Sequence, residues 1–514
     1  MMKIMEYLTE TGSKMVRHLQ THWRIWARGG YGFGIKASPW ILIIFFSYLY
    51  IWLAWLNDSH LRNGLDLGIF HQGVYLLSEG ELPQSSLKQQ MLWGDHASFV
   101  LVPIAMVYRF FPDVRTLLVL QVLAITTSGW ALWATARKKV KSDWFALALL
   151  ASYLMFFGIQ YALDFDFHPA VFTAGAIAWT LFFLTTKRYT WYAVAVALGL
   201  LTQEDAAPVF AMIGAWLLFQ KRWQVGGATL ATALVYFVIV TYFIMPQWTP
   251  GNIRAVHFDI GGSTGSPVRN LAGAAVHPLR TWQNMTDTGD KRRTLKELSR
   301  SFGYTHMLSP FTYLASAPNL VSRMLSDQYP RHMVSYHYNV QLAPVFAFGS
   351  ILTVAWFSKK AKEKYRNWSK WHFFIPMIAG VLVLYGAWAT SWQDPDLPLR
   401  QLQEPEFTEK KYRPIYSRPA LEIVKAMIPN NRSVSVASGL LPVLSDRKYV
   451  FNFPEPFPKQ TQWVVLSPEF NTWPLPRGEM ESYIEQFKED PDYELVMEDY
   501  GLFVFKKIAR QVAD

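Results

Sequence analysis

The chain has 514 residues, of which 51% are hydrophobic, 16% aromatic and only 17% charged. This composition excludes disordered, collagen-like and disulfide-scaffold proteins. Cysteine is absent, which also excludes a thiolate metal site and a cysteine nucleophile.

The net charge of +11 is unevenly distributed. Residues 1–391 carry 34 Lys and Arg against 19 Asp and Glu, whereas residues 392–514 carry 15 against 19, which gives +15 and −4. The basic residues of the first part lie in short clusters between long apolar runs. This arrangement is typical of the cytoplasmic loops of membrane proteins and argues against nucleic acid as a partner.

The first predicted membrane crossing covers residues 37–56, an uncharged apolar run long enough to span a bilayer. The 36 residues before it hold six Lys and Arg and two Glu, so the N-terminus is expected in the cytoplasm. Residues 14–30 within this segment predict a basic, aromatic helix that lies on the inner membrane surface.

Five basic clusters, taken as cytoplasmic, place the other crossings; they cover residues 137–141, 187–188, 221–222, 291–293 and 359–364. Crossings are then predicted near 114–136, 144–162, 170–186, 190–202, 206–220, 225–245, 340–357 and 371–390. Residues 268–285 and 296–316 form either two more crossings or one re-entrant excursion. Nine or eleven crossings both place the C-terminus outside. Because the crossings are helices, a mainly α polytopic bundle is expected.

Residues 190–220 are nearly all apolar, with Glu204 and Asp205 in the interruption. A Lys-Arg pair at both ends predicts a hairpin, whose arms of about 15 residues would reach about 22 Å, short of the hydrocarbon core of about 30 Å. Both acids are therefore expected below the outer surface, facing a polar cavity and not lipid, as functional intramembrane residues. The alternative is that the bilayer thins locally and the pair is hydrated.

Two juxtamembrane helices, 65–77 and 96–111, are predicted within a first external loop covering 57–113. Asp66 lies in apolar surroundings, which would raise the pKa of its carboxyl toward that of a general base; the alternative is a helix N-terminal acid stabilised by the dipole. Asp95 and His96 fit the arrangement of a helix N-cap. The alternative is that they bind a metal ion or a phosphate, because a His lies next to the acid.

The segment from Asp164 to His168 alternates polar and aromatic residues. If it is extended, Asp164, Asp166 and His168 share one face that could hold a divalent cation or a sugar, and the two Phe would pack on lipid or a prenyl chain. The alternative is a solvated loop with two anchoring aromatics.

Basic residues on the same side could bind an anionic leaving group, since Arg pairs well with phosphate. The candidates are Arg254, His257 and Arg269 in the loop 246–270, together with Arg331, His332 and His337. Contact with lipid headgroups is the alternative for each of them.

A Pro-rich linker follows residue 392, and the composition then becomes that of a small external α/β domain, 392–514. A helix is predicted over 420–429. Strands are predicted over 432–438, 448–453, 462–467 and 493–507 from their alternating or short apolar patterns.

The ordered set of motifs resembles the membrane-protein family catalogued as domain of unknown function 2079. The motifs are LDLGIFHQGVY, GDHASFVLVPIAMVYRFFP, DFDFHPA, QEDAAPVF, VSYHYNVQLAPVF and IPNNRSVSVASGLLPVLSDRKYVFNFP. The family pattern has Asp where this chain has His71 and Lys where it has Gln203, so a charge role at these two positions is not expected here.

That family resembles the GT-C superfamily of integral-membrane glycosyltransferases. The resemblance implies an acid in the first external loop, a polyprenyl-phosphate-linked sugar as donor and inversion at the anomeric carbon. The expected activity is sugar transfer to an acceptor hydroxyl of a glycan, lipid or protein at the extracytoplasmic face of the inner (plasma) membrane. A transporter or flippase of lipids or lipid-linked glycans, or a membrane scaffold or sensor, is the alternative.

Within this hypothesis the residues take three roles. Asp66, Glu204 and Asp205 are the expected catalytic residues, with Asp66 as the base. Substrate binding is expected from Asp95, His96, Arg254, His257, Arg269, Arg331 and His337. A divalent cation, Mg²⁺ or Mn²⁺, is the expected cofactor if one is used, held by Asp164, Asp166 and His168.

Overall fold

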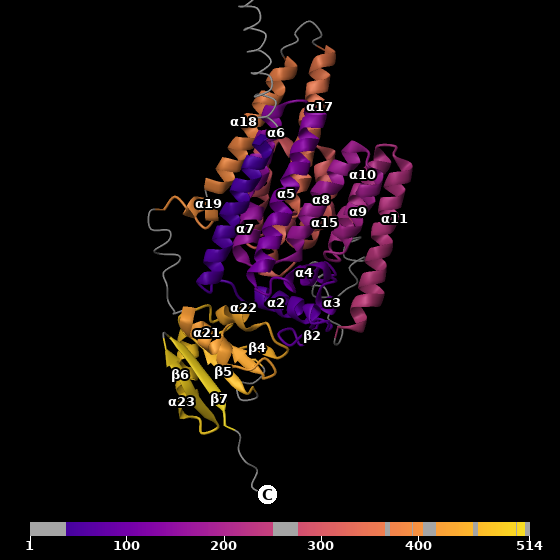
Figure 1. The fold of residues 1–514 in the computed structure, drawn as a ribbon. Coiled ribbons are helices and arrows are strands. Elements are labelled where there is room, and N and C mark those ends of the chain that lie inside the picture. The colour runs from indigo at the N-terminus through magenta and orange to yellow at the C-terminus, as the bar shows by residue number, and fades with distance from the viewer. Residues whose placement is uncertain are drawn as a thin grey trace, which may run out of the picture.

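A computed structural model describes residues 37–249, 276–364, 371–392, 394–404, 418–455, 461–499 and 501–508. The predicted surface helix 14–30 and the candidates Arg254, His257 and Arg269 lie outside these ranges. The described chain forms a helical bundle with a small mixed α/β domain at one end (Figure 1), and this confirms the predicted fold class.

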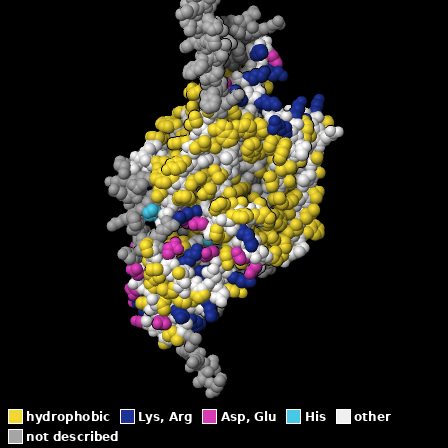
Figure 2. All heavy atoms as spheres, viewed as in Figure 1, with side chains coloured by type: hydrophobic (Ala, Val, Ile, Leu, Met, Phe, Trp, Pro, Cys, Tyr) yellow, Lys and Arg dark blue, Asp and Glu magenta, His cyan; other side chains and the backbone are white. Residues whose placement is uncertain are grey.

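Within the described ranges, seven helical stretches are long and apolar enough to cross a membrane. They are Ala37–Ser59, α5 (Arg115–Val140), α6 with α7 (Asp143–Leu154 and Phe157–Phe165), α8 (Pro169–Thr186), α11 with η1 and η2 (Trp223–Ile239, Val240–Ile244 and Met245–Gln247), η5 with α17 (His337–Asn339 and Leu342–Lys364), and α18 (Trp371–Trp392). Their exposed faces carry large apolar side chains such as Ile44 and Phe243, and Figure 2 shows these side chains covering the bundle. Such a surface suits lipid rather than water.

The predicted short hairpin is confirmed by α9 (Tyr189–Leu200) and α10 (Ala206–Phe219), which have 12 and 14 residues. Gly199 lies against Phe210 across the hairpin. The connecting turn, residues 201–205, lies at the end of the bundle that carries the C-terminal domain (Figure 1). Both acids of the turn therefore lie on the domain side.

Residues 278–332, which the structure describes between α11 and α17, form a re-entrant excursion. It comprises α13 (Pro278–Met285), α14 (Gly289–Arg300), η4 (Ser301–Leu308), α15 (Pro310–Met324) and α16 (Tyr329–His332). Gly303 of η4 has φ +57° and lies against Leu382, midway along α18, where a Cβ would clash. Thr305 also donates to Ser350 Oγ of α17, at 2.9 Å. The chain thus enters the bundle interior through η4 and returns through α15.

The basic cluster at 291–293 lies at the same end of the bundle as the C-terminal domain. Arg293 Nη2 pairs with Asp394 Oδ2 at 2.9 Å, and Asp394 follows α18 at the end that leads to the C-terminal domain. The prediction that this cluster lies on the same side as the cluster at 359–364 is therefore wrong, and its charge is partly neutralised by an acid from a distant segment. The cluster at 359–364 lies at the opposite end of the bundle, where Figure 2 shows Lys and Arg side chains gathered.

The first external loop forms a layer between the bundle and the C-terminal domain (Figure 1). It contains α2 (Leu65–Ser78), β1 (Gln84–Ser85), β2 (Gln90–Met91), α3 (Leu92–Asp95) and α4 (Leu101–Tyr108). The helix expected over 65–77 is present. The helix expected over 96–111 starts only at Leu101, and the short antiparallel β1–β2 pair was not predicted.

The C-terminal domain has a five-stranded mixed sheet in the order β4-β3-β5-β7-β6. The strands are β3 (Val434–Val436), β4 (Val450–Asn452), β5 (Trp463–Leu466), β6 (Tyr493–Asp499) and β7 (Leu502–Lys507), and all fall within predicted strand segments. The helices of the domain are α21 (Arg418–Met427), η6 (Ser438–Leu440), α22 (Leu441–Leu444) and α23 (Arg477–Glu489), of which only α21 was predicted. The short helix α19 (Pro398–Gln401) lies in the predicted linker and packs against α7 and α18 of the bundle (Figure 1).

The domain is docked on α2 by buried hydrogen bonds. His71 Nδ1 donates to the carbonyl of Pro442 at 2.7 Å, and its Nε2 accepts from Tyr108 Oη at 2.7 Å. Gln72 Nε2 donates to the carbonyls of Arg447 and Lys448. Burial lowers the pKa of His71. A neutral imidazole therefore makes this contact, and the docking fixes α2 from the side opposite to the bundle.

Candidate active site

The first turn of α2 is fixed by Asp166, which lies between α7 and α8. The Asp166 carboxylate accepts from Asn63 Nδ2 at 2.9 Å, from the Leu67 amide at 3.3 Å and from the Gly64 amide at 3.4 Å. These amides belong to the start of the helix, where backbone donors otherwise lack partners. Asp166 thus positions the turn that carries Asp66.

Asp66 lies opposite His168, whose Nε2 is 3.3 Å from Asp66 Oδ2. The His168 side chain is 4% exposed, whereas that of Asp66 is 40% exposed, so the carboxylate has an open side. The imidazole stacks between Phe165 and His337, with centroid distances of 5.5 and 3.6 Å. Its orientation toward Asp66 is therefore fixed by packing.

The pKa of Asp66 is lowered, although its burial alone would raise it. The hydrogen bond and the charge of His168, together with the charge of Lys88, outweigh the burial. The expectation that the apolar helix raises this pKa is wrong, because the sequence could not show that His168 would lie beside the carboxyl. Asp66 is ionised at neutral pH and is able to accept a proton.

Glu204 is 1% exposed and is held by the first external loop. Its Oε1 accepts from His96 Nδ1 at 2.8 Å, and its Oε2 accepts from the Ala97 amide at 3.0 Å. Burial opposes protonation of His96, but the charge and hydrogen bond of Glu204 outweigh it and raise the pKa of His96 to about 9. The two side chains thus form an ion pair at neutral pH.

Asp205 joins the same turn to the start of α17. Gln341 Nε2 donates to its two carboxylate oxygens at 3.3 and 3.5 Å. Burial and the charge of Glu204 raise the pKa of Asp205 to about 6, against the opposing charges of His96 and Arg331. The hairpin acids therefore form hydrogen bonds with polar groups of the protein.

Arg323 of α15 is a further residue of this region that the sequence analysis did not identify. It is 2% exposed, and its Nε donates to the carbonyl of Arg331 at 2.7 Å. Its Nη1 donates to Asn319 Oδ1, Tyr338 O and Asn339 Oδ1, each at 3.0 Å. Its buried Nη2 has no partner among the described residues. The sequence feature that could have identified Arg323 is its place in the stretch 310–324, which is otherwise uncharged.

Most of the other described candidates lie in the same region. Asp95 pairs with Lys88 at 3.1 Å, and both charges act on Asp66. The charge of Arg331 acts on Asp205. We call the set of Asp66, Asp95, His96, Asp166, His168, Glu204, Asp205, Arg323, Arg331 and His337 the external polar cluster. It joins the first external loop, the turn between α7 and α8, the α9–α10 turn and the segment from α15 to α17.

Two candidates lie apart from this cluster. Asp164 is part of α7, and its Oδ1 accepts from Asn57 Nδ2 at 3.0 Å. His332 lies beside α14, where its carbonyl accepts from Thr294 Oγ1 at 2.8 Å. His332 therefore packs within the re-entrant segment, between α16 and α14.

The segment 164–168 is not one extended strand, because α7 continues through Phe165. Phe167 is fully buried in a protein core, so the expected aromatic face on lipid is also wrong. Asp164, Asp166 and His168 are directed to different partners, and no group of three or more His, Asp or Glu within the described ranges could hold a metal ion. The described donors thus do not fit the expected metal site.

The sequence profile of the family described as predicted membrane protein (DUF2079) matches residues 58–504. The chain belongs to this family. No curated protein matches this DUF2079 chain. Its fold is similar to that of ArnT from Cupriavidus metallidurans bound to undecaprenyl phosphate, with a TM-score of 0.50 and 13% identity over 92% of this chain and 99% of that one.

Two further solved structures are more weakly similar to the DUF2079 chain. The apo state of the same ArnT has a TM-score of 0.49 and 12% identity over 92% of this chain and 99% of that one. The oligosaccharyltransferase from Archaeoglobus fulgidus in the apo form has a TM-score of 0.39 and 11% identity over 84% and 70% of the two chains. The likeness to the bound ArnT shows a GT-C-like fold.

Proposed function

We propose that this DUF2079 protein is an inverting glycosyltransferase that moves a sugar from a polyprenyl-phosphate donor to an acceptor hydroxyl. The observation that carries the proposal is Asp66, a partly open carboxylate kept ionised by His168 on the first-loop helix of a GT-C-like fold. The bound undecaprenyl phosphate of the similar ArnT structure supports the choice of lipid. The proposed acceptor is a glycan, lipid or protein.

In the proposed reaction Asp66 takes the proton of the acceptor hydroxyl as the acceptor oxygen attacks C1 of the sugar. The bond between C1 and the phosphate oxygen breaks, and polyprenyl phosphate leaves with the bonding electron pair. Attack and departure on opposite faces invert the anomeric centre, as in inverting hydrolases. The negative charge that develops on the phosphate must be stabilised by cations.

His168 is the proposed positioning residue for this base. Its ring is fixed between Phe165 and His337 and presents Nε2 to one oxygen of Asp66. In this proposal the contact keeps the carboxylate ionised, while the Asp66 side chain remains partly exposed.

The leaving phosphate is proposed to meet the cations of the external polar cluster. Arg331 and the protonated His96 are the first candidates, and the unpartnered Nη2 of Arg323 supports a third. The guanidinium groups suit a phosphate because they donate two parallel hydrogen bonds. The Mg²⁺ or Mn²⁺ of the sequence-based expectation has no converging ligand set here, so no step is assigned to it.

We place this reaction at the extracytoplasmic face of the inner membrane. The basic clusters at 137–141, 187–188, 221–222 and 359–364 lie at the bundle end away from the C-terminal domain, and Lys and Arg mark cytoplasmic ends. The N-terminus would then be cytoplasmic, and the external polar cluster would face the cell envelope.

The test is turnover by purified protein in liposomes offered a panel of polyprenyl-phosphate sugars. We expect release of polyprenyl phosphate from at least one donor, with the transferred sugar in the inverted configuration. Liposomes without protein serve as the control. Absence of release from every donor, with donor lipid still bound to the protein, would contradict the proposal.

A further inference from the structure

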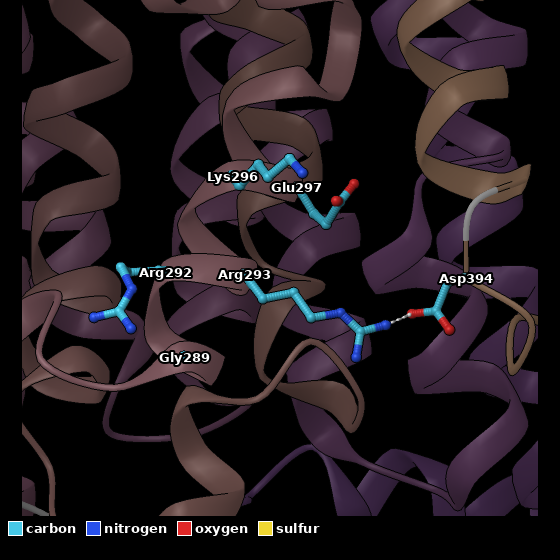
Figure 3. A pocket seen from close by; sticks show the side chains of 6 residues that line it. All are labelled: Gly289, Arg292, Arg293, Lys296, Glu297 and Asp394. Atoms are coloured by element: carbon cyan, nitrogen blue, oxygen red, sulfur yellow. Dashed lines mark hydrogen bonds and ion pairs between the residues drawn. The ribbon is translucent and has the colours of Figure 1, made fainter.

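A second polar site lies outside the external polar cluster, between α14 and the segment that follows α18. It is a cavity of about 390 Å³ lined by Gly289, Arg292, Arg293, Lys296, Glu297 and Asp394 (Figure 3). We call it the α14 pocket. Its volume lies within the range of about 300–1,000 Å³ typical of ligand sites, so it exceeds what a single ion needs.

The cations of this pocket share one face of α14, because residues three and four apart in a helix are neighbours. Figure 3 shows Arg293 reaching toward Asp394 and Arg292 lying on the other side of the pocket. Both arginines and Lys296 are exposed. Three positive charges within two helical turns repel one another unless anions lie between them.

The acids of the pocket neutralise only part of this charge. Asp394 forms an ion pair with Arg293 at 2.9 Å, and Glu297 accepts a hydrogen bond from Arg300 Nη1 at 3.2 Å. Arg292 Nη1 donates to the carbonyls of Thr286 and Asp287, which carry no net charge.

Lys296 has no carboxylate partner in the described part of the chain. Arg292 and Lys296 thus leave a positive excess of two charges on an open pocket. A multiply charged anion could pair with both of these cations.

We propose that the α14 pocket binds a phosphorylated group, such as a diphosphate or a phosphate that carries a sugar. Guanidinium and ammonium groups recognise phosphate oxygens, the lining offers no apolar wall for a lipid chain, and the volume admits more than one phosphate. The pocket lies beside the outer end of α18, where Trp388 and Trp392 are exposed, at the depth of lipid headgroups. The phosphate can therefore come from a membrane lipid or from a soluble compound.

The experiment measures binding and not turnover, so its result does not depend on the proposed transferase activity. Inorganic pyrophosphate is titrated into purified full-length protein in uncharged detergent by calorimetry. We expect saturable binding, weakened about tenfold for each charge removed in Arg292→Gln/Lys296→Gln. The matched control is Lys359→Gln/Lys360→Gln, which removes two charges at the opposite end of the bundle and should bind as the wild type does.

The source of the phosphate is distinguished by repeating the titration in nanodiscs. If phosphatidylglycerol nanodiscs suppress pyrophosphate binding and phosphatidylcholine nanodiscs do not, an anionic lipid headgroup occupies the pocket. If both leave binding intact, the ligand is a soluble phosphorylated compound. Absence of saturable binding, or equal weakening in the control variant, would overturn the proposal.

Discussion

His168 and Asp66 lie 102 residues apart in the chain, yet the imidazole Nε2 is 3.3 Å from the Asp66 carboxylate. The contact depends on the positions of two further residues. Asp166 fixes the first turn of α2, and His337 stacks on His168 from the segment before α17. Three parts of the chain, α2, the turn between α7 and α8 and the segment before α17, therefore determine the protonation state of one open carboxylate.

Replacement of His168 should move the acid limb of the pH–rate profile. Burial raises the pKa of Asp66 while His168 lowers it. His168→Ala should therefore shift the acid limb of kcat/KM to higher pH, because the remaining burial effect favours the protonated carboxyl. His168→Gln retains a donor without a charge and should give a smaller shift. An unchanged acid limb in both variants would show that Asp66 is not the titrating base.

Asp166→Asn should change how stability depends on pH. Burial and the charge of Asp66 raise the pKa of Asp166 to about 8, whereas an unfolded Asp titrates near about 3.9. Between these values the folded state binds a proton that the unfolded state has released, so stability falls as pH rises. Thermal unfolding from pH 5 to 8 should show this fall in the wild type and a smaller one in Asp166→Asn. The exposed Asp396→Asn is the control and should keep the wild-type slope.

The His96–Glu204 pair should couple the first loop to the α9–α10 turn. His96→Ala leaves a buried carboxylate without its cation, which should cost about 3 kcal/mol or more. The double variant His96→Ala/Glu204→Gln should lose less than the sum of the single variants. Additive losses in a double-mutant cycle would show that the two groups do not interact.

The same pair makes a pH-dependent contribution. The folded pKa of His96, about 9, lies above the unfolded value of about 6.5. Its stabilising contribution is therefore complete below about pH 6.5 and is lost as pH rises through 9. The difference in unfolding midpoint between the wild type and His96→Ala should shrink over that interval, and a constant difference would contradict the ion pair.

Thiol labelling can test the sidedness of the re-entrant segment. The natural sequence has no cysteine, so each introduced residue is the only thiol. An impermeant maleimide added to intact cells should label Lys296→Cys of α14 and Glu494→Cys of β6, but label Lys359→Cys of α17 only after lysis. Labelling of Lys359→Cys in intact cells, or protection of Lys296→Cys, would contradict this arrangement.

Some features could be predicted from the sequence because they depend on local patterns. A Lys-Arg pair at each end of an apolar stretch, with two acids between, specifies the α9–α10 hairpin and the position of Glu204 in its turn. Period-two and short apolar patterns likewise mark the strands of the C-terminal domain. The motifs in the turns also identified most members of the external polar cluster.

The features that were missed depend on contacts between distant segments. Arg323 is held mainly by backbone carbonyls and amide side chains that the re-entrant segment brings together, so no acidic partner marks it in the sequence. The cluster around Arg293 was grouped with the cluster at 359–364, because its neutralising Asp394 lies 101 residues away and their proximity cannot be read from the sequence. The three candidate metal ligands do not converge in the structure, because the helical end of α7 separates Asp164 from Asp166 and His168.

The most direct test of the central claim is turnover by Asp66→Asn beside Glu79→Gln, an exposed acid at the other end of α2. With the donor that the wild type uses, we predict that Asp66→Asn loses at least about 100-fold in polyprenyl phosphate release, the lower range for a general base, while its donor binding and unfolding midpoint stay near those of the wild type. Glu79→Gln should turn over normally. Undiminished release by a folded Asp66→Asn would contradict the assignment of Asp66 as the base.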